Sequence, residues 1–172
     1  MTNSPENKYA EVEKQIDEIL SDGKLHLFPP GFGTFLLVNL LMIVGICGLL
    51  IAAKDVLFDQ MEQAATFMVL GVLVFSIIIV TPPFLVVRGF RKALPFLKRM
   101  IIVLSVLTFI SGVANLMIGG FYGLYAAVGF ICLVIAYMLA NSNAYQLLSM
   151  FTARRRELAL EALERKKEVL SK

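Results

Sequence analysis

The chain contains 172 residues, of which 58% are hydrophobic and 17% are charged, and its formal net charge is +3. Soluble domains average about 45–50% apolar and about 25% charged residues. The composition therefore excludes an ordinary soluble domain and predicts one integral membrane bundle. Cys47 and Cys132 both lie inside long apolar runs, which favours small buried hydrophobic side chains over a disulfide framework.

Residues 1–24 are predicted to form an amphipathic surface helix. Ser4 is a suitable N-cap, and Pro5 suits the first helical turn. The apolar stripe that recurs at helical spacing comprises Tyr9, Val12, Ile16, Ile19 and Leu20. Such a stripe is suited to docking on the bundle, on a partner or on the lipid interface, and these alternatives stay open. Residues 25–32 are expected to be a connector, because Pro29 and Pro30 forbid a helix there.

Four apolar spans are predicted within a transmembrane bundle over residues 33–141. Each is close to or above the roughly 20 apolar residues that cross a hydrocarbon core, and none contains Asp, Glu, Lys, Arg or His. The expected spans are residues 33–53, 64–87, 100–118 and 122–140. Residues 54–63 are expected to form a hydrophilic loop. Pro82 and Pro83 are expected to cause a bend or an unwound turn near the end of the second span.

Small and amide side chains within the spans indicate how the helices meet. Small residues stand four positions apart in the pairs Gly48 and Ala52, Thr108 and Gly112, Gly119 and Gly123, and Ala136 and Ala140. This spacing lets helix backbones approach closely. Asn39 and Asn115 are predicted to make interhelical polar contacts, because an amide in lipid gains roughly 0.6 kcal/mol, and up to about 1.7 kcal/mol, from a partner. Their alternative role is to line a pore in an oligomer.

Basic residues predict the orientation of the bundle. These residues gather after the second span and after the fourth span. The sequence predicts that they contact a partner or lipid. The set comprises Arg88, Arg91, Lys92, Lys98, Arg99, Arg154, Arg155 and Arg156. Because basic loops remain cytoplasmic, both termini are predicted to be cytoplasmic. So short a multi-pass chain favours the bacterial inner membrane.

Residues 142–172 are predicted to form a cytosolic helix that continues the fourth span without a break. The segment is rich in strong helix formers. Opposite charges four positions apart, such as Glu161 and Arg165, add further support for a helix. The overall prediction is therefore an all-α membrane protein with four transmembrane helices and a helix at each terminus.

No catalytic, cofactor or metal site is predicted. Ionisable side chains inside a membrane usually mark function, and their absence from the spans excludes proton relays, histidine-held haem and metal-dependent hydrolysis. His26 is the single histidine of the sequence, whereas a metal site needs several ligands. Nucleic acid is not an expected partner, since its recognition needs a larger basic surface with an element that reads the bases.

The predicted function is that of a non-enzymatic, multi-pass inner-membrane anchor, sensor or subunit. Its C-terminal helix and central basic loop are expected to recruit a cytosolic protein, as the membrane component of a stress-response or phage-defence complex would, and self-association stays open. The first alternative is an immunity protein against a pore-forming toxin, by analogy of architecture. The second alternative is an oligomeric channel lined by Asn, Ser and Thr side chains.

Overall fold

The computed structural model describes residues 29–57, 61–90 and 92–170, and the regular structure within these ranges is all α-helical. The described helices are α2 (Phe32–Leu57), α3 (Met61–Val87), α4 (Ala93–Met117), α5 (Gly123–Ala140) and α6 (Asn143–Leu170). This confirms the predicted all-α class. The predicted N-terminal helix over residues 1–24, His26 and most of the connector lie outside the described residues.

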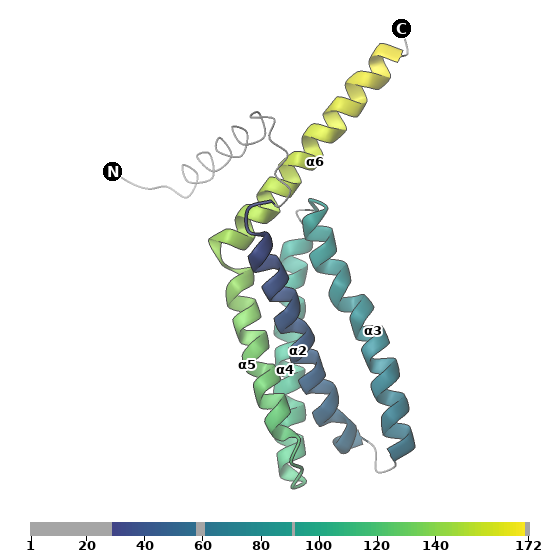
Figure 1. Ribbon diagram of the computed structural model, residues 1–172, viewed down its shortest axis with the longest axis vertical. Helices are drawn as coiled ribbons and strands as arrows, with labels where there is room; N and C mark the ends of the chain where they lie inside the picture. Colours follow the sequence, from purple (N-terminus) through teal and green to yellow (C-terminus); the bar gives the residue numbers. More distant parts are fainter. Residues whose placement is uncertain (1–28, 58–60, 91, 171–172) are drawn as a thin grey trace, which may run out of the picture.

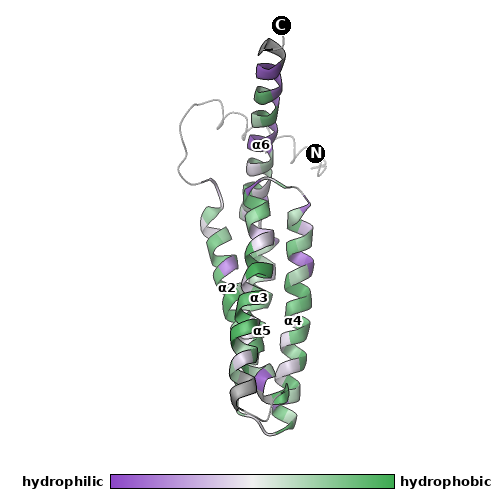
Figure 2. Cartoon of the chain, turned by 90° about the vertical axis from the view of Figure 1, so that its right-hand side faces the viewer, coloured by the Kyte–Doolittle hydropathy of each residue, from purple (hydrophilic) through white to green (hydrophobic). Residues whose placement is uncertain are grey.

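Four of these helices are long and apolar enough to cross a membrane. The candidate spans are Phe32–Lys54, Ala65–Val87, Ala93–Met117 and Gly123–Ala140. Figure 2 shows them as a largely hydrophobic bundle, whereas the far part of α6 alternates between hydrophilic and hydrophobic residues. The prediction of a multi-pass membrane protein is confirmed at this level.

Helix α2 is the centre of the bundle, because it packs against α3, α4 and α5 (Figure 1). Side chains that are fully or almost fully buried come from several helices and form one continuous core; the largest of them include Met42, Leu50, Leu97, Ile101 and Leu133. Lipid tails are as apolar as these side chains, so the helices associate through van der Waals packing and close backbone approach rather than through the hydrophobic effect.

Glycines form a close backbone contact between α2 and α5. A Cβ atom added at Gly48 would lie 2.5 Å from the carbonyl oxygen of Tyr125 and 3.1 Å from the Cα of Gly129. A Cβ added at Gly129 would lie 2.9 Å from the carbonyl oxygen of Gly45. Because these neighbours are backbone atoms, the two helices can come this close only where neither carries a side chain.

The ends of several helices differ from the predicted ones. Helix α2 continues to Leu57 and α3 begins at Met61, so the loop predicted over residues 54–63 is mostly helical. Helix α4 begins at Ala93, seven residues before the predicted span. Pro95 does not prevent this early start, since it lies in the first turn, where a missing N–H costs no hydrogen bond.

Helix α3 runs to Val87 with Pro82 and Pro83 inside it. Of the two predicted alternatives, the unwound turn is therefore absent, and the bend stays a prediction. Both prolines are buried, and helix-breaking residues in membrane helices are tolerated where neighbouring elements support the backbone.

The predicted continuous helix from the fourth span into the C-terminal segment is wrong. Helix α5 ends at Ala140, and α6 starts anew at Asn143. Ser142 is the reason, because its hydroxyl accepts a 3.4 Å hydrogen bond from the backbone N–H of Tyr145 and so caps the new helix. Asn141 helps to close α5, since its side chain donates to the carbonyl of Tyr137 at 2.9 Å.

Candidate functional site at the junction of α6 and the bundle

The first half of α6 packs across one end of the bundle, and its second half extends away from it (Figure 1). The buried part of α6 comprises Tyr145, Leu148, Ser149, Phe151, Thr152 and Ala153. The hydroxyl of Tyr145 is fully buried and has no hydrogen-bond partner within the described part of the chain. Burial raises the pKa of this phenol above its ordinary range, so the group stays protonated at physiological pH.

The turn between α3 and α4 holds α6 in place through backbone contacts. The Thr152 hydroxyl donates a hydrogen bond, and the carbonyl oxygens of Val86 and Leu148 both lie 2.9 Å from it. Gly89 has a φ of +78°, a conformation that side chains disfavour. A Cβ at Gly89 would also collide with the carbonyl oxygen of Thr152. The glycine thus lets the α3–α4 turn rest directly on the α6 backbone.

This contact brings together basic residues from distant parts of the sequence. Arg88 and Lys92 are exposed on the α3–α4 turn, and Arg155 and Arg156 are exposed on α6. Arg154 is half-buried and forms a 3.7 Å ion pair with Glu157. Because both segments occupy one end of the bundle, their positive charges reinforce one another. We call this end the basic junction.

The other basic residues that the sequence predicts to contact a partner or lipid are not shown in the basic junction. Lys98 is half-buried and Arg99 is exposed, and both lie on the second turn of α4 rather than in a loop. Arg91 lies outside the described residues. The basic junction is therefore built from the α3–α4 turn and α6, with Lys98 and Arg99 farther along α4.

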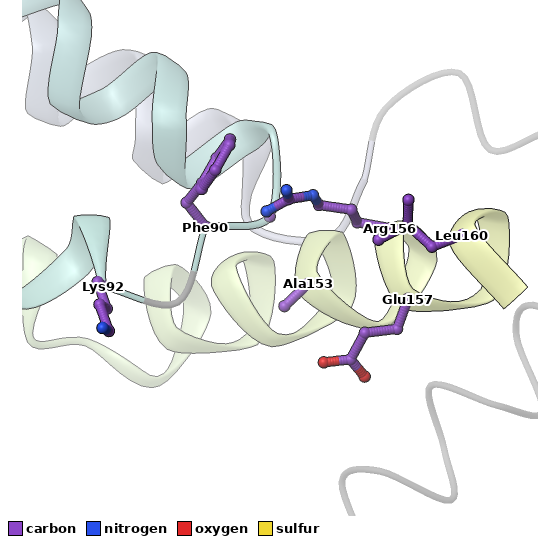
Figure 3. Close-up of a pocket in the computed structure, with 7 residues that line it drawn as sticks. Phe90, Lys92, Ala153, Arg156, Glu157 and Leu160 are labelled. Carbon is purple, nitrogen blue, oxygen red and sulfur yellow. The ribbon is translucent and has the colours of Figure 1, made fainter.

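A surface hollow lies within the basic junction, between the α3–α4 turn and α6. Its volume is about 330 Å³, and it is lined by Gly89, Phe90, Lys92, Ala153, Arg156, Glu157 and Leu160. Figure 3 shows Phe90 and Arg156 pointing toward one another. The guanidinium carbon of Arg156 lies 3.8 Å from the centre of the Phe90 ring, a cation–π contact that fixes the charged group in position.

The two asparagines predicted to link helices behave differently. Asn115 is fully buried, and its side-chain nitrogen donates to the carbonyl of Ala52 on α2 at 3.2 Å. Asn39 instead donates at 2.8 Å to the carbonyl of Phe35 in its own helix. This hydrogen bond of Asn39 therefore stabilises α2 locally and does not join it to a neighbour.

No group of three or more His, Cys, Asp or Glu side chains is arranged to hold a metal ion within residues 29–57, 61–90 and 92–170. Comparisons with known protein families, curated proteins and solved structures find no match to this chain. The hollow beside Arg156 was not predicted from the sequence. Its one sequence signal is the alternation of Phe90 with basic residues in the segment that follows the second span.

Proposed function

We propose that this protein is a non-enzymatic, multi-pass membrane anchor or sensor that recruits a cytosolic protein through α6. In this proposal the basic junction faces the cytoplasm of a bacterial cell, and the chain acts in the inner membrane as a single copy or as a homo-oligomer. Orientation follows from the clustered bases, because Lys and Arg near span ends are retained on the cytoplasmic side.

The observation that carries the proposal is the exposed outer half of α6. This helix has 28 residues, which corresponds to a length of about 42 Å. Side chains of residues 158–167 are all exposed. An isolated helical stretch shorter than about 12–15 residues, such as this one, is only marginally stable in water, and packing of one face usually stabilises it. This favours a partner on the outer half.

Apolar side chains mark the face that a partner would cover. Leu160 and Leu163 are 49% and 56% exposed. At 100° per residue, the two leucines lie within the same third of the helix circumference. Closer to the bundle, the same face of α6 carries the buried residues Tyr145 and Ser149. Glu161 and Arg165 lie on the opposite side of the helix. A partner with an amphipathic helix or an apolar groove fits such a surface.

Changing Leu160 and Leu163 together to serine is expected to abolish recruitment. Each leucine in a well-packed interface contributes about 1–2 kcal/mol or more, so affinity should fall at least about 30-fold. The measurement is quantitative mass spectrometry of cytosolic proteins that co-purify with the full chain in mild detergent. The matched control changes Glu161 and Arg165 to glutamine, on the opposite face of the same two turns.

Folding of the leucine variant is not expected to change, because both side chains are exposed. Co-purification of a cytosolic protein with the wild type and the control, but not with the leucine variant, supports the proposal. Equal recovery of that protein with all three chains would exclude α6 as the recruiting surface.

A further inference from the structure

We propose that the hollow at the basic junction binds the phosphate of an anionic phospholipid headgroup. This inference goes beyond the recruiting role and does not depend on it, since it requires only that the bundle spans a membrane. The ligand would sit between the α3–α4 turn and α6, with Arg156 as its direct cationic contact and Lys92 as a second positive charge on the lining.

The position of the hollow along the bundle fits a lipid headgroup. Two candidate spans flank it, because one ends at Val87 and the next begins at Ala93, whereas Gly89, Phe90 and Lys92 line the hollow. Residues that join the ends of two membrane spans lie at the depth of the lipid headgroups. Phosphate groups therefore surround this site at high local concentration.

The charges around the hollow favour an anion. Arg156 and Lys92 are both lining residues; Arg156 points toward Phe90, and Lys92 lies on the other side of the hollow (Figure 3). The one acidic side chain among the lining residues, Glu157, lies 3.7 Å from Arg154, so its negative charge is largely balanced. Basic pockets beside membrane helices recognise anionic headgroups, and each cation near the surface contributes about a factor of five in affinity.

Arg156 is held ready for a phosphate. Its guanidinium stacks on Phe90 at 3.8 Å, which fixes the plane of the group and reduces the entropy lost on binding. The backbone that carries Phe90 is held in place, because Phe90 follows Gly89, whose backbone packs against the Thr152 carbonyl of α6. A planar guanidinium can donate two parallel hydrogen bonds to phosphate oxygens.

Apolar surface at the hollow suits the rest of a lipid molecule. Phe90, which closely follows the end of the second span, is 40% exposed and lines the hollow. The volume of about 330 Å³ is at the lower end of the range for small-molecule sites and matches a headgroup with its glycerol. The acyl chains would continue along the bundle into the bilayer. This combination of cations and apolar surface favours a phospholipid over free phosphate.

The test measures lipid binding to the purified full chain by native mass spectrometry in detergent. The probes are phosphatidylglycerol, phosphatidylcholine with the same acyl chains, and inorganic phosphate as a competitor. Wild type is expected to retain phosphatidylglycerol at least tenfold better than phosphatidylcholine. Changing Lys92 and Arg156 together to glutamine should lower the affinity for phosphatidylglycerol roughly 25-fold, at a factor of about five per cation.

A matched control removes two exposed cations farther out on α6, by changing Arg165 and Lys166 to glutamine. This control should keep wild-type affinity, and Arg156→Lys, which keeps the charge but loses the planar donor, should bind with intermediate affinity. Equal weakening by the control, or equal retention of the two lipids, would overturn the proposal. Displacement of the lipid by millimolar phosphate would show that free phosphate is the ligand and would overturn it as well. Because the only ligands are lipid and phosphate, a failure of partner recruitment leaves this result unaffected.

Discussion

Replacing Gly48 with valine is expected to lower the melting temperature of the detergent-purified protein by about 2–12 °C. A Cβ at this position would meet the carbonyl oxygen of Tyr125 at 2.5 Å and the Cα of Gly129 at 3.1 Å. Backbone atoms cannot rotate away as a side chain can, so α2 and α5 must separate. Overpacking of this kind costs typically 1–3 kcal/mol, and 1 kcal/mol shifts the melting temperature of a chain of this size by about 2–4 °C.

Gly33 supplies the matched control for this substitution. It lies on the same helix, and a Cβ there would meet nothing within 4 Å. Gly33→Val makes the same chemical change and is expected to leave the melting temperature within about 1 °C of wild type. A Gly48→Val protein as stable as Gly33→Val would show that α2 and α5 do not pack through their glycines.

Replacing Gly89 with alanine is expected to release α6 from the bundle. Its φ of +78° costs a residue with a Cβ about 1–2 kcal/mol, and the new methyl group would collide with the Thr152 carbonyl. Local opening of α6 should therefore become at least about tenfold more frequent. The measurement is the rate of limited trypsin cleavage at Arg155 and Arg156, which rises with the population of the open form.

Gly119 separates the backbone effect from the steric effect. Its φ is +75°, yet a Cβ there would meet nothing within 4 Å, and it lies in the turn between α4 and α5 at the other end of the bundle. Gly119→Ala carries the same backbone strain and should leave tryptic cleavage of α6 unchanged. Similar cleavage rates for Gly89→Ala and wild type would mean that the α3–α4 turn does not hold α6.

The membrane spans could be predicted because their signal is local. Long runs without charge mark the helices, and the predicted ends at Val87 and Ala140 coincide with the ends of α3 and α5. The sequence predicts too late a start for α4, because basic residues such as Lys98 favour a loop. Lys98 is half-buried on the second turn of α4, where a long side chain can still carry its charge toward water.

Small-residue spacing also predicted close packing correctly in most places. Gly48, Gly112 and Ala136 are buried at helix contacts, whereas Gly119 is exposed. Composition alone cannot separate these cases, because Gly119 is required by its positive φ in a turn and not by a neighbouring helix.

The candidate site was predictable only as a set of charges. The basic residues are evident in the sequence. The structure brings those of the α3–α4 turn and of α6 to one end of the bundle because the helix is interrupted at Ser142. A capping serine at that position redirects the chain, and α6 then packs across the bundle end instead of extending α5. The pairing of Phe90 with Arg156 joins residues far apart in the chain, so no local pattern reveals it.

Cysteine labelling of spheroplasts tests most directly whether the basic junction faces the cytoplasm. Cys47 and Cys132 are first changed to alanine, since both are free thiols. Single cysteines then replace Ile118, exposed in the turn between α4 and α5, or Lys167, exposed on outer α6. A membrane-impermeant maleimide should label the Ile118→Cys chain in intact spheroplasts and the Lys167→Cys chain only after permeabilisation. Labelling of Lys167→Cys in intact spheroplasts would contradict a cytoplasmic α6 and, with it, the recruitment of a cytosolic partner.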